Sequence, residues 1–334
     1  MPDHLTHPQR CRAVLNFQPA DRLPRIEWAG YWDQTLNRWR REGLPAEPGD
    51  AFKIRNELFG LDPYWQIWIT PRGPQTPTAS HHGAGIVADL NEYERVKHAL
   101  YPRYELANMG KMLRRQEAGE LVVWYTLEGF FWFPRMLLGI EPHLYAFYDQ
   151  PDLMHRINAD LLAYNLDLVG KIRALGQPVF MTLAEDMSYN HGPMLSKQLF
   201  DEFLAPYYRP LTAAIHEAGQ PILVDTDGDV TTMIPWLQAV GVDGCLPLER
   251  QAGVDGMAIR QAHPRWLMIG HYDKMVMSRG EQAMRAEFER LWPLMRSGGY
   301  LPSVDHQTPP EVPLDQYRVF LRLLEEYARR CTPQ

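Results

Sequence analysis

The chain has 334 residues, of which 45% are hydrophobic and 22% charged, and its formal net charge is −7. This composition is typical of a soluble globular protein and excludes a disordered chain, which needs less apolar content. The acidic balance, without a stripe of Lys and Arg, argues against nucleic acid as a partner.

The cysteine content and the hydropathy indicate in which cellular compartment the protein is expected. Cys11, Cys245 and Cys331 are odd in number and far apart, so they form neither a disulfide framework nor a CxxC site. The first residues lack the apolar core of a signal peptide, and no apolar stretch approaches the ~18 residues of a membrane span. We therefore expect a cytoplasmic protein with no membrane segment.

The first 120 residues show an irregular order of elements. The pattern predicts a strand at 23–29 and an amphipathic helix at 33–41. The aromatic and β-branched run at 64–70 predicts an accessory strand. Residues 70–85, rich in Pro, Gly, Thr, Ser and His, predict a loop or hairpin.

Strands and helices then alternate regularly, which predicts a parallel sheet. About seven or eight such units favour a closed (β/α)8 barrel over an open doubly wound sheet. We expect a single domain over 1–334, with accessory helices and a hairpin in 1–120 and regular units in 121–330. The predicted strands are 121–127, 179–184, 221–224, 244–248, 266–269 and 299–304. The predicted helices are 151–174, 196–218 with a break near Pro206, 231–240, 255–262, 281–296 and 314–329.

Acidic and imidazole side chains follow five consecutive predicted strands. In a barrel the carboxyl ends of all strands lie on one face, where the active site forms. The residues at these ends are Glu185, Asp186, Asp225, Asp227, Asp229, Glu249, His271, Asp273, Lys274, Asp305 and His306.

Some of these side chains have a simpler structural role. Asp229 precedes a helix and is expected to be an N-cap. Glu185 and Glu249 end apolar strands, where no cap is needed, and Asp305 with His306 precedes a turn already set by prolines. Such a cluster can hold a divalent metal such as Zn²⁺. Alternatively, crowded carboxylates raise one another's pKa and act as general acids or bases.

Four segments resemble the uroporphyrinogen decarboxylase-like family. They are RCRAVLNFQPADRLPRIEW near the start, then LPLERQAGVDGMAIR, LMIGHYDKMVMSRG and GGYLPSVDHQTPPEVPLDQYRVFLRLL. The resemblance extends over about residues 8–330 and is most specific in the last 150 residues. It implies a (β/α)8 barrel and one of two chemistries: metal-free decarboxylation of tetrapyrrole acetates, or methyl transfer by zinc-dependent, corrinoid-linked enzymes.

The chain departs from both branches. Where the decarboxylases carry an Arg-Gln-Ala-Gly-Arg stretch that binds substrate carboxylates, this chain reads EWAGYWDQTLNRW. Where the methyltransferases carry His-x-Cys, it has Asp225-Thr226-Asp227, and Asp305-His306 stands near their later cysteine. Glu185 matches their strand-end glutamate. The resemblance therefore implies an oxygen-rich zinc site made of Glu185, Asp227, Glu249 and His306.

The leading hypothesis is a methyltransferase that moves a methyl group from a small, methoxylated donor to a corrinoid held by a partner protein. Oxygen ligands leave more positive charge on zinc than thiolates, which suits polarising an ether oxygen. The family also forms homodimers. The expected catalytic residues are Glu185, Asp227, Glu249, Asp305 and His306. The expected substrate-binding residues are Trp28, Tyr31, Trp32, Tyr125, Phe131, Tyr189, His271, Tyr272 and Lys274.

Two alternatives stay open at this point. One is a metal-free decarboxylase or lyase, in which Arg25, Arg250 or Lys274 binds the substrate carboxylate and Asp227 or Asp305 protonates the carbanion. The other is a non-catalytic protein that binds a corrinoid or tetrapyrrole without turnover.

Overall fold

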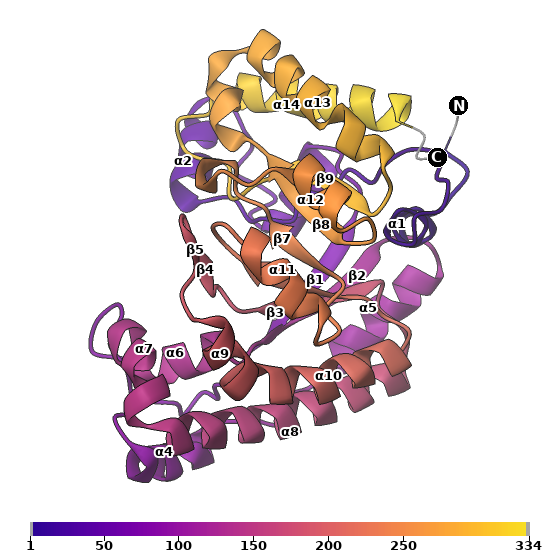
Figure 1. The fold of residues 1–334 in the computed structure, drawn as a ribbon. Coiled ribbons are helices and arrows are strands. Elements are labelled where there is room, and N and C mark those ends of the chain that lie inside the picture. The colour runs from indigo at the N-terminus through magenta and orange to yellow at the C-terminus, as the bar shows by residue number, and fades with distance from the viewer. Residues whose placement is uncertain (1–2, 332–334) are drawn as a thin grey trace.

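The main sheet of the protein is parallel throughout and curled (Figure 1). The computed structural model describes residues 3–331. Within them the sheet has seven strands in the order β1-β2-β3-β6-β7-β8-β9. These are β1 (Tyr64–Ile69), β2 (Val122–Glu128), β3 (Phe180–Ala184), β6 (Ile222–Thr226), β7 (Gly244–Pro247), β8 (Leu267–Tyr272) and β9 (Tyr300–Val304).

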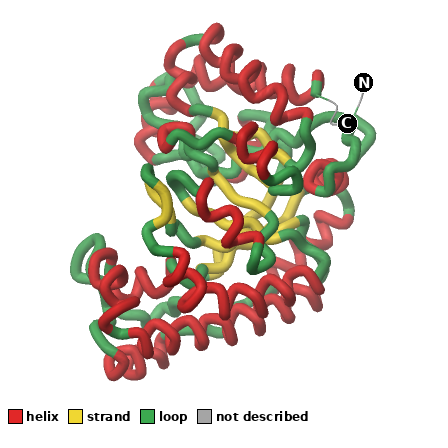
Figure 2. Tube along the Cα trace, viewed as in Figure 1, coloured by secondary structure: helices red, strands yellow, loops and turns green. Residues whose placement is uncertain are grey.

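Helices surround the sheet, so that strands occupy the centre of the molecule and helices its periphery (Figure 2). Thr6 caps the first helix, since its hydroxyl accepts from the Gln9 backbone and the Gln9 side chain accepts from the Thr6 backbone. The helices are α1 (His7–Leu15), α2 (Asp33–Arg41), α3 (Ala51–Lys53), α4 (Leu90–Val96), α5 (Ala107–Glu117), α6 (Trp132–Leu138), α7 (Ile140–Asp149), α8 (Pro151–Leu175), α9 (Lys197–Leu199), α10 (Ala205–Glu217), α11 (Ile234–Gln238), α12 (Gly256–Ala262), α13 (Glu281–Arg296) and α14 (Leu314–Arg330).

The strand predicted at 23–29 does not form, so the sheet has seven strands where eight were expected. The segment is nevertheless extended between the two edge strands. The Trp28 backbone donates to Ser303 Oγ of β9 (3.3 Å), and Tyr64 of β1 donates to the Glu27 carbonyl (2.6 Å). Pro24 lacks a backbone N–H, which removes one donor from any ladder here. The segment therefore bridges the gap through side chains instead of a regular ladder.

The accessory role predicted for the strand at 64–70 is wrong. Tyr64–Ile69 is the first strand of the main sheet and pairs in parallel with β2 along its whole length. Residues 70–85 form a loop, as one of the two expectations had it. The hairpin of the structure lies elsewhere, in β4 (Ser188–Tyr189) and β5 (Gly192–Pro193).

The regular alternation predicted after residue 120 is confirmed for every strand and helix. The predicted helix at 281–296 matches α13 residue for residue. The break expected near Pro206 appears as a π-helical turn, Phe200–Leu204, before α10 begins at Ala205. Asp255 is the N-cap of α12 and accepts from the Met257 and Ala258 backbones.

Aromatic rings fill the interior of the curled sheet. Trp124 of β2 stacks between Tyr64 of β1 and Phe180 of β3, with ring centroids 4.3 and 5.0 Å apart. This packing closes the interior and leaves the carboxyl ends of the strands as the place for a site. No helix among residues 3–331 combines the length and apolar character that crossing a bilayer requires.

We expect that Asp62→Ala lowers the free energy of unfolding by about 3 kcal/mol, because the buried Arg22 guanidinium loses its two hydrogen bonds to Asp62 and keeps only the half-buried Asp3 as an ion partner among residues 3–331. Burial opposes the charge of Asp62, but contacts from His7 and Arg22 outweigh it and hold the pKa of Asp62 well below its ordinary 3.8. This stability is therefore present above pH 3.8 and is lost as the pH falls below it. Urea unfolding at several pH values measures both effects, and the exposed Glu105→Ala is the control.

Candidate functional site

A pocket of about 390 Å³ lies at the carboxyl end of the sheet, and we call it the acid pocket. It receives side chains from the segment after residue 27, from β1, α6 and β6, and from the loops after β3 and β9. Its lining residues are Trp28, Ala29, Gly30, Gln66, Trp68, Trp132, Ala184, Glu185, Asp186, Asp225, Thr226, Asp227, His306 and Gln307. Four of them are carboxylic acids, three are tryptophans, and none is Lys or Arg.

Two aspartates at the end of β6 have pKa values raised toward neutral pH. Burial raises the pKa of Asp225 to about 8, helped by the negative charges of Asp227 and Asp186. Burial also raises the pKa of Asp227 to about 7, with Glu249 and Asp186 adding to the effect and Lys274 opposing it. The acid pocket thus contains carboxyl groups that can donate a proton at physiological pH.

His306 and Asp227 face each other across the pocket mouth. His306 Nε2 lies 3.6 Å from Asp227 Oδ2, and its ring meets Trp28 edge-on with centroids 6.4 Å apart. Burial, together with the charge of Lys274, lowers the pKa of His306. His306 is therefore a neutral imidazole at pH 7, and its Nε2 lies just beyond hydrogen-bond distance of Asp227.

Asp305, Lys274 and Glu249 form a network beside the pocket. Asp305 is buried and accepts from the backbones of Arg250 (3.0 Å) and Lys274 (3.2 Å) and from Lys274 Nζ (3.2 Å). Lys274 Nζ also lies 3.9 Å from Glu249, whose other oxygen accepts from the Gly228 backbone (3.0 Å). These predicted residues order the loops after β7, β8 and β9 and do not line the acid pocket.

Glu185 lines the pocket wall, but both its oxygens are engaged. One accepts from the Phe130 backbone (2.9 Å) and from Tyr208 Oη (2.5 Å). The other accepts from the backbones of Phe131 (2.7 Å) and Trp132 (3.1 Å). Burial raises the pKa of Glu185 to about 7, although these hydrogen bonds oppose the shift. Its place in the fold is to anchor the start of α6 to the end of β3.

Most of the aromatic residues expected in the pocket lie elsewhere, and only Trp28 lines it. Tyr31 is buried beside Tyr317, and its hydroxyl contacts the Tyr317 hydroxyl at 2.8 Å. Tyr272 packs against Phe288 and Phe320, behind the sheet. Tyr125 alternates on β2 with the inward-facing Trp124 and is buried on the other side of the sheet. Phe131 is buried before α6, and Trp32 and Tyr189 are exposed.

His271, a predicted substrate-binding residue, has a structural role. Its Nε2 accepts from the Gly256 backbone (3.0 Å), and its Nδ1 contacts the Leu248 carbonyl (2.9 Å). Burial, with the positive charge of Arg290, lowers the pKa of His271 to about 3. The imidazole is therefore neutral and joins β8 to the start of α12.

Several lining residues were not singled out from the sequence. Asp225 and Asp186 stood among the strand-end carboxylates but were not chosen. Gln66 and Trp68 follow Tyr64 at two-residue spacing, so they share the face of β1 that Tyr64 turns inward. The two-residue spacing would have indicated Gln66 and Trp68 if residues 64–70 had been predicted as part of the main sheet. Trp132 and Gln307 carried no comparable signal.

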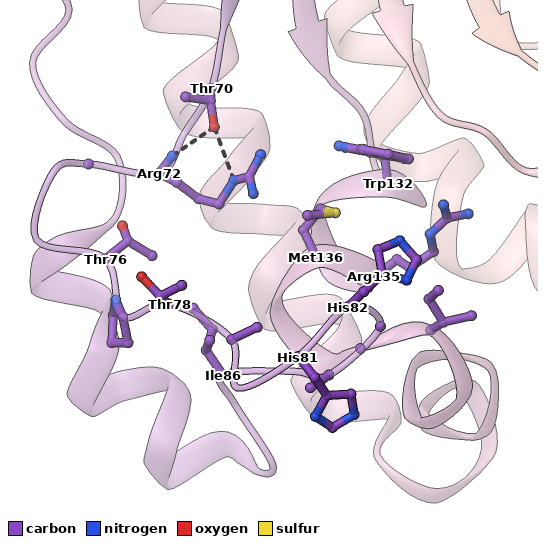
Figure 3. A pocket seen from close by; sticks show the side chains of 17 residues that line it. Thr70, Arg72, Thr76, Thr78, His81, His82, Ile86, Trp132, Arg135 and Met136 are labelled. Carbon is purple, nitrogen blue, oxygen red and sulfur yellow. Dashed lines mark hydrogen bonds between the residues drawn. The ribbon is translucent and has the colours of Figure 1, made fainter. Parts of the chain in front are cut away.

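A second pocket, of about 540 Å³, lies between the loop after β1 and α6, and we call it the basic pocket (Figure 3). Its charged and imidazole residues are Arg72, His81, His82 and Arg135, and no Asp or Glu lines it. Trp132 lines both pockets.

Residues 75–327 match the family model described as uroporphyrinogen decarboxylase (URO-D). The chain belongs to the URO-D family. This confirms the resemblance drawn from the sequence, while no curated protein sequence matches the chain.

Solved structures resemble the chain to different degrees. A methyltransferase from Methanosarcina mazei superposes with a TM-score of 0.69 at 14% identity, over 97% of this chain and 99% of that one. A putative vitamin-B12-independent methionine synthase from Listeria monocytogenes gives 0.45 at 13% identity (92% and 96%), and YdhT from Bacillus subtilis gives 0.47 at 12% identity (92% and 86%). The first shows that this URO-D member shares its fold with a methyltransferase.

The four residues expected to bind zinc do not form a zinc site. No group of three or more His, Cys, Asp or Glu side chains in residues 3–331 is placed to hold a metal ion. The oxygens of Glu185 are already occupied, and Glu249 lies beside Lys274. Only Asp227 and His306 remain as a pair, and a zinc site needs at least three protein ligands.

We expect Glu185→Ala to lower the free energy of unfolding by about 2–3 kcal/mol, because three buried backbone N–H groups lose their acceptor. Glu185→Gln should cost less, since one side-chain oxygen can still accept. Thermal or urea unfolding measures the difference. Exposed Glu202→Ala serves as the control, and an equal loss in all three variants would contradict the anchoring role.

We also expect substoichiometric zinc, below about 0.2 atom per chain, in protein purified without chelators, since the donors do not reach the three ligands of a zinc site. Elemental analysis of the wild type measures this. One zinc per chain, lost in both Asp227→Asn and His306→Gln, would contradict the geometric argument.

Proposed function

We propose that this URO-D protein is a methyltransferase that takes the methyl group of a small methoxylated donor, with Asp227 as the proton donor. The observation that supports it is the character of the acid pocket: protonated carboxyl groups beside three tryptophans, and no cation. A pocket of this kind favours a neutral, partly apolar methoxy group of the donor and can supply a proton to its leaving oxygen.

The reaction breaks the bond between the methyl carbon and the ether oxygen, and the bonding electron pair stays on the oxygen. Asp227 transfers its proton to that oxygen, which leaves as an alcohol or phenol. Asp227, whose side chain is 41% exposed, regains its proton from solvent. In this class of reaction a corrinoid on a partner protein supplies the electron pair that accepts the methyl group.

Exposed apolar side chains at the carboxyl end of the sheet support a protein partner. Trp68 at the end of β1 is 44% exposed, Tyr189 in the hairpin after β3 is 54% exposed, and Met275 after β8 is 40% exposed. Apolar groups exposed around a site favour contact with another molecule. We therefore propose that the corrinoid protein docks over this end of the sheet.

The acid pocket gives no support to the decarboxylase alternative in the form that uses Arg25, Arg250 or Lys274 as the carboxylate binder. A decarboxylase needs a cation for the substrate carboxylate beside the proton donor. Arg25 is engaged by Asp62 and Glu325, and Arg250 donates to the Val254 carbonyl. Lys274 is bound to Asp305. None of these three lines the acid pocket.

We expect Asp227→Asn to slow methyl transfer about 10²- to 10⁴-fold, the range for loss of a general acid. The pKa of Asp227 is raised to about 7, so the protonated form prevails below pH 7. The wild-type rate should therefore fall as the pH rises above 7, and this dependence should disappear in Asp227→Asn.

Methyl transfer to cob(I)alamin from a methoxylated donor, followed by absorbance, measures the rate. Asp229→Asn is the matched control, because Asp229 follows the same strand but caps the next turn and does not line the pocket. A full rate in Asp227→Asn would assign the proton donor elsewhere. Carbon dioxide release without methyl transfer would instead favour the decarboxylase.

A further inference from the structure

The acid pocket and the basic pocket are neighbours of opposite charge. The acid pocket is lined by four carboxylic acids and by no Lys or Arg. The basic pocket is lined by two arginines and two histidines and by no Asp or Glu. Two adjoining cavities with separated charge fit a single ligand with two chemically different ends better than two copies of one ligand.

The two pockets meet at the Trp132 side chain, and Arg135 lies beside it on the side of the basic pocket. Trp132 lines both cavities. The Arg135 guanidinium stacks on the Trp132 ring at 4.7 Å and donates to Asp186 at 2.7 Å. Asp186 lines the acid pocket, whereas Arg135 lines the basic one. A ligand that reaches from one pocket to the other would therefore meet a flat indole ring on its way.

Arg72 is held rigidly on the opposite side of the basic pocket from Arg135 (Figure 3). Its Nε donates to Thr70 Oγ1 (3.1 Å) and its Nη2 to Glu128 (2.7 Å). Glu128 is fully buried and is not part of the pocket lining, so this ion pair lies behind the wall while Arg72 itself lines the cavity. Its Nη1 group has no acceptor among residues 3–331 and is available to a ligand anion.

The rest of the basic pocket is largely apolar. Pro77, Ala79 and Ile86 come from the loop after β1, and Met136 and Ile140 from α6 and α7. Such a lining accommodates a ring or short alkyl chain, while the arginines can bind an anionic group.

We propose that the basic pocket binds the anionic end of the methyl donor, a carboxylate or a phosphate, while its methoxy end lies in the acid pocket. The inference rests on the proposed function and adds the substrate class: a small methoxylated compound, with a flat spacer against Trp132, that carries an anion at the far end. Arg72 and Arg135 are then specificity residues.

Equilibrium binding to the full chain, measured by calorimetry without any methyl acceptor, tests the proposal. The probes are 4-methoxybenzoate, 4-methoxyphenyl phosphate and the uncharged 4-methoxybenzyl alcohol. At least one anion should bind about tenfold more tightly than the alcohol, as expected for one added charge-assisted hydrogen bond. The tighter of the two anions identifies the preferred group. Equal affinities for all three probes would overturn the inference, and this comparison needs no variant.

The double variant Arg72→Gln/Glu128→Gln removes the positive charge together with its buried partner and retains a hydrogen bond between the two positions. It should weaken binding of the preferred anion about tenfold and change binding of the alcohol less than twofold. Arg103→Gln/Glu105→Gln is the matched control, because that pair is 88% and 83% exposed and lies outside both pockets. Unchanged anion binding in the Arg72→Gln/Glu128→Gln variant would contradict the role of Arg72.

The two proposals can fail separately. Anion-selective binding without methyl transfer to cob(I)alamin would support the basic pocket and overturn the proposed function. Methyl transfer from neutral and anionic donors with equal affinity would support the function and overturn the basic pocket.

Discussion

The carboxylate of Glu185 is the contact on which both pockets depend. It accepts from three consecutive backbone N–H groups, at Phe130, Phe131 and Trp132, and so fixes the first turn of α6 against the end of β3. The chain passes so close that a Cβ at Gly129 would lie 2.1 Å from this carboxylate, so only glycine fits there. Trp132, the wall between the pockets, is placed by this arrangement.

The acid pocket brings four carboxyl groups together, and its lining contains no Lys or Arg. A single exposed aspartate is ionised at pH 7, but Asp225, Asp227 and Asp186 share one partly dry cavity. Burial in this cavity, and after it the neighbouring negative charges, raises the pKa of Asp225 to about 8 and that of Asp227 to about 7. The charge of Lys274 opposes the shift at Asp227, but its ammonium group donates to Asp305 and Gln251 and does not line the pocket.

The sequence predicted the fold well where periodicity was strong. The units after residue 120 were correct because buried parallel strands and amphipathic helices leave distinct patterns. The segment 23–29 has the composition of a strand, but its pairing depends on tertiary contacts that no local pattern contains. For the site, the strand-end rule located Asp227 and His306. It could not show that Glu185 and His271 serve the backbone, or that Trp132 comes from a helix to complete the wall.

The hydrogen bond from Arg135 to Asp186 couples the electrostatics of the two pockets. An anion in the basic pocket would share the Arg135 guanidinium and leave the charge of Asp186 less neutralised. That charge already raises the pKa values of Asp225 and Asp227, so both would hold their protons more firmly once the anion is bound. An anion bound in the basic pocket would thereby favour the protonated form of Asp225 and Asp227 in the acid pocket. The two halves of a ligand, offered as separate fragments, would then bind with free energies that do not simply add.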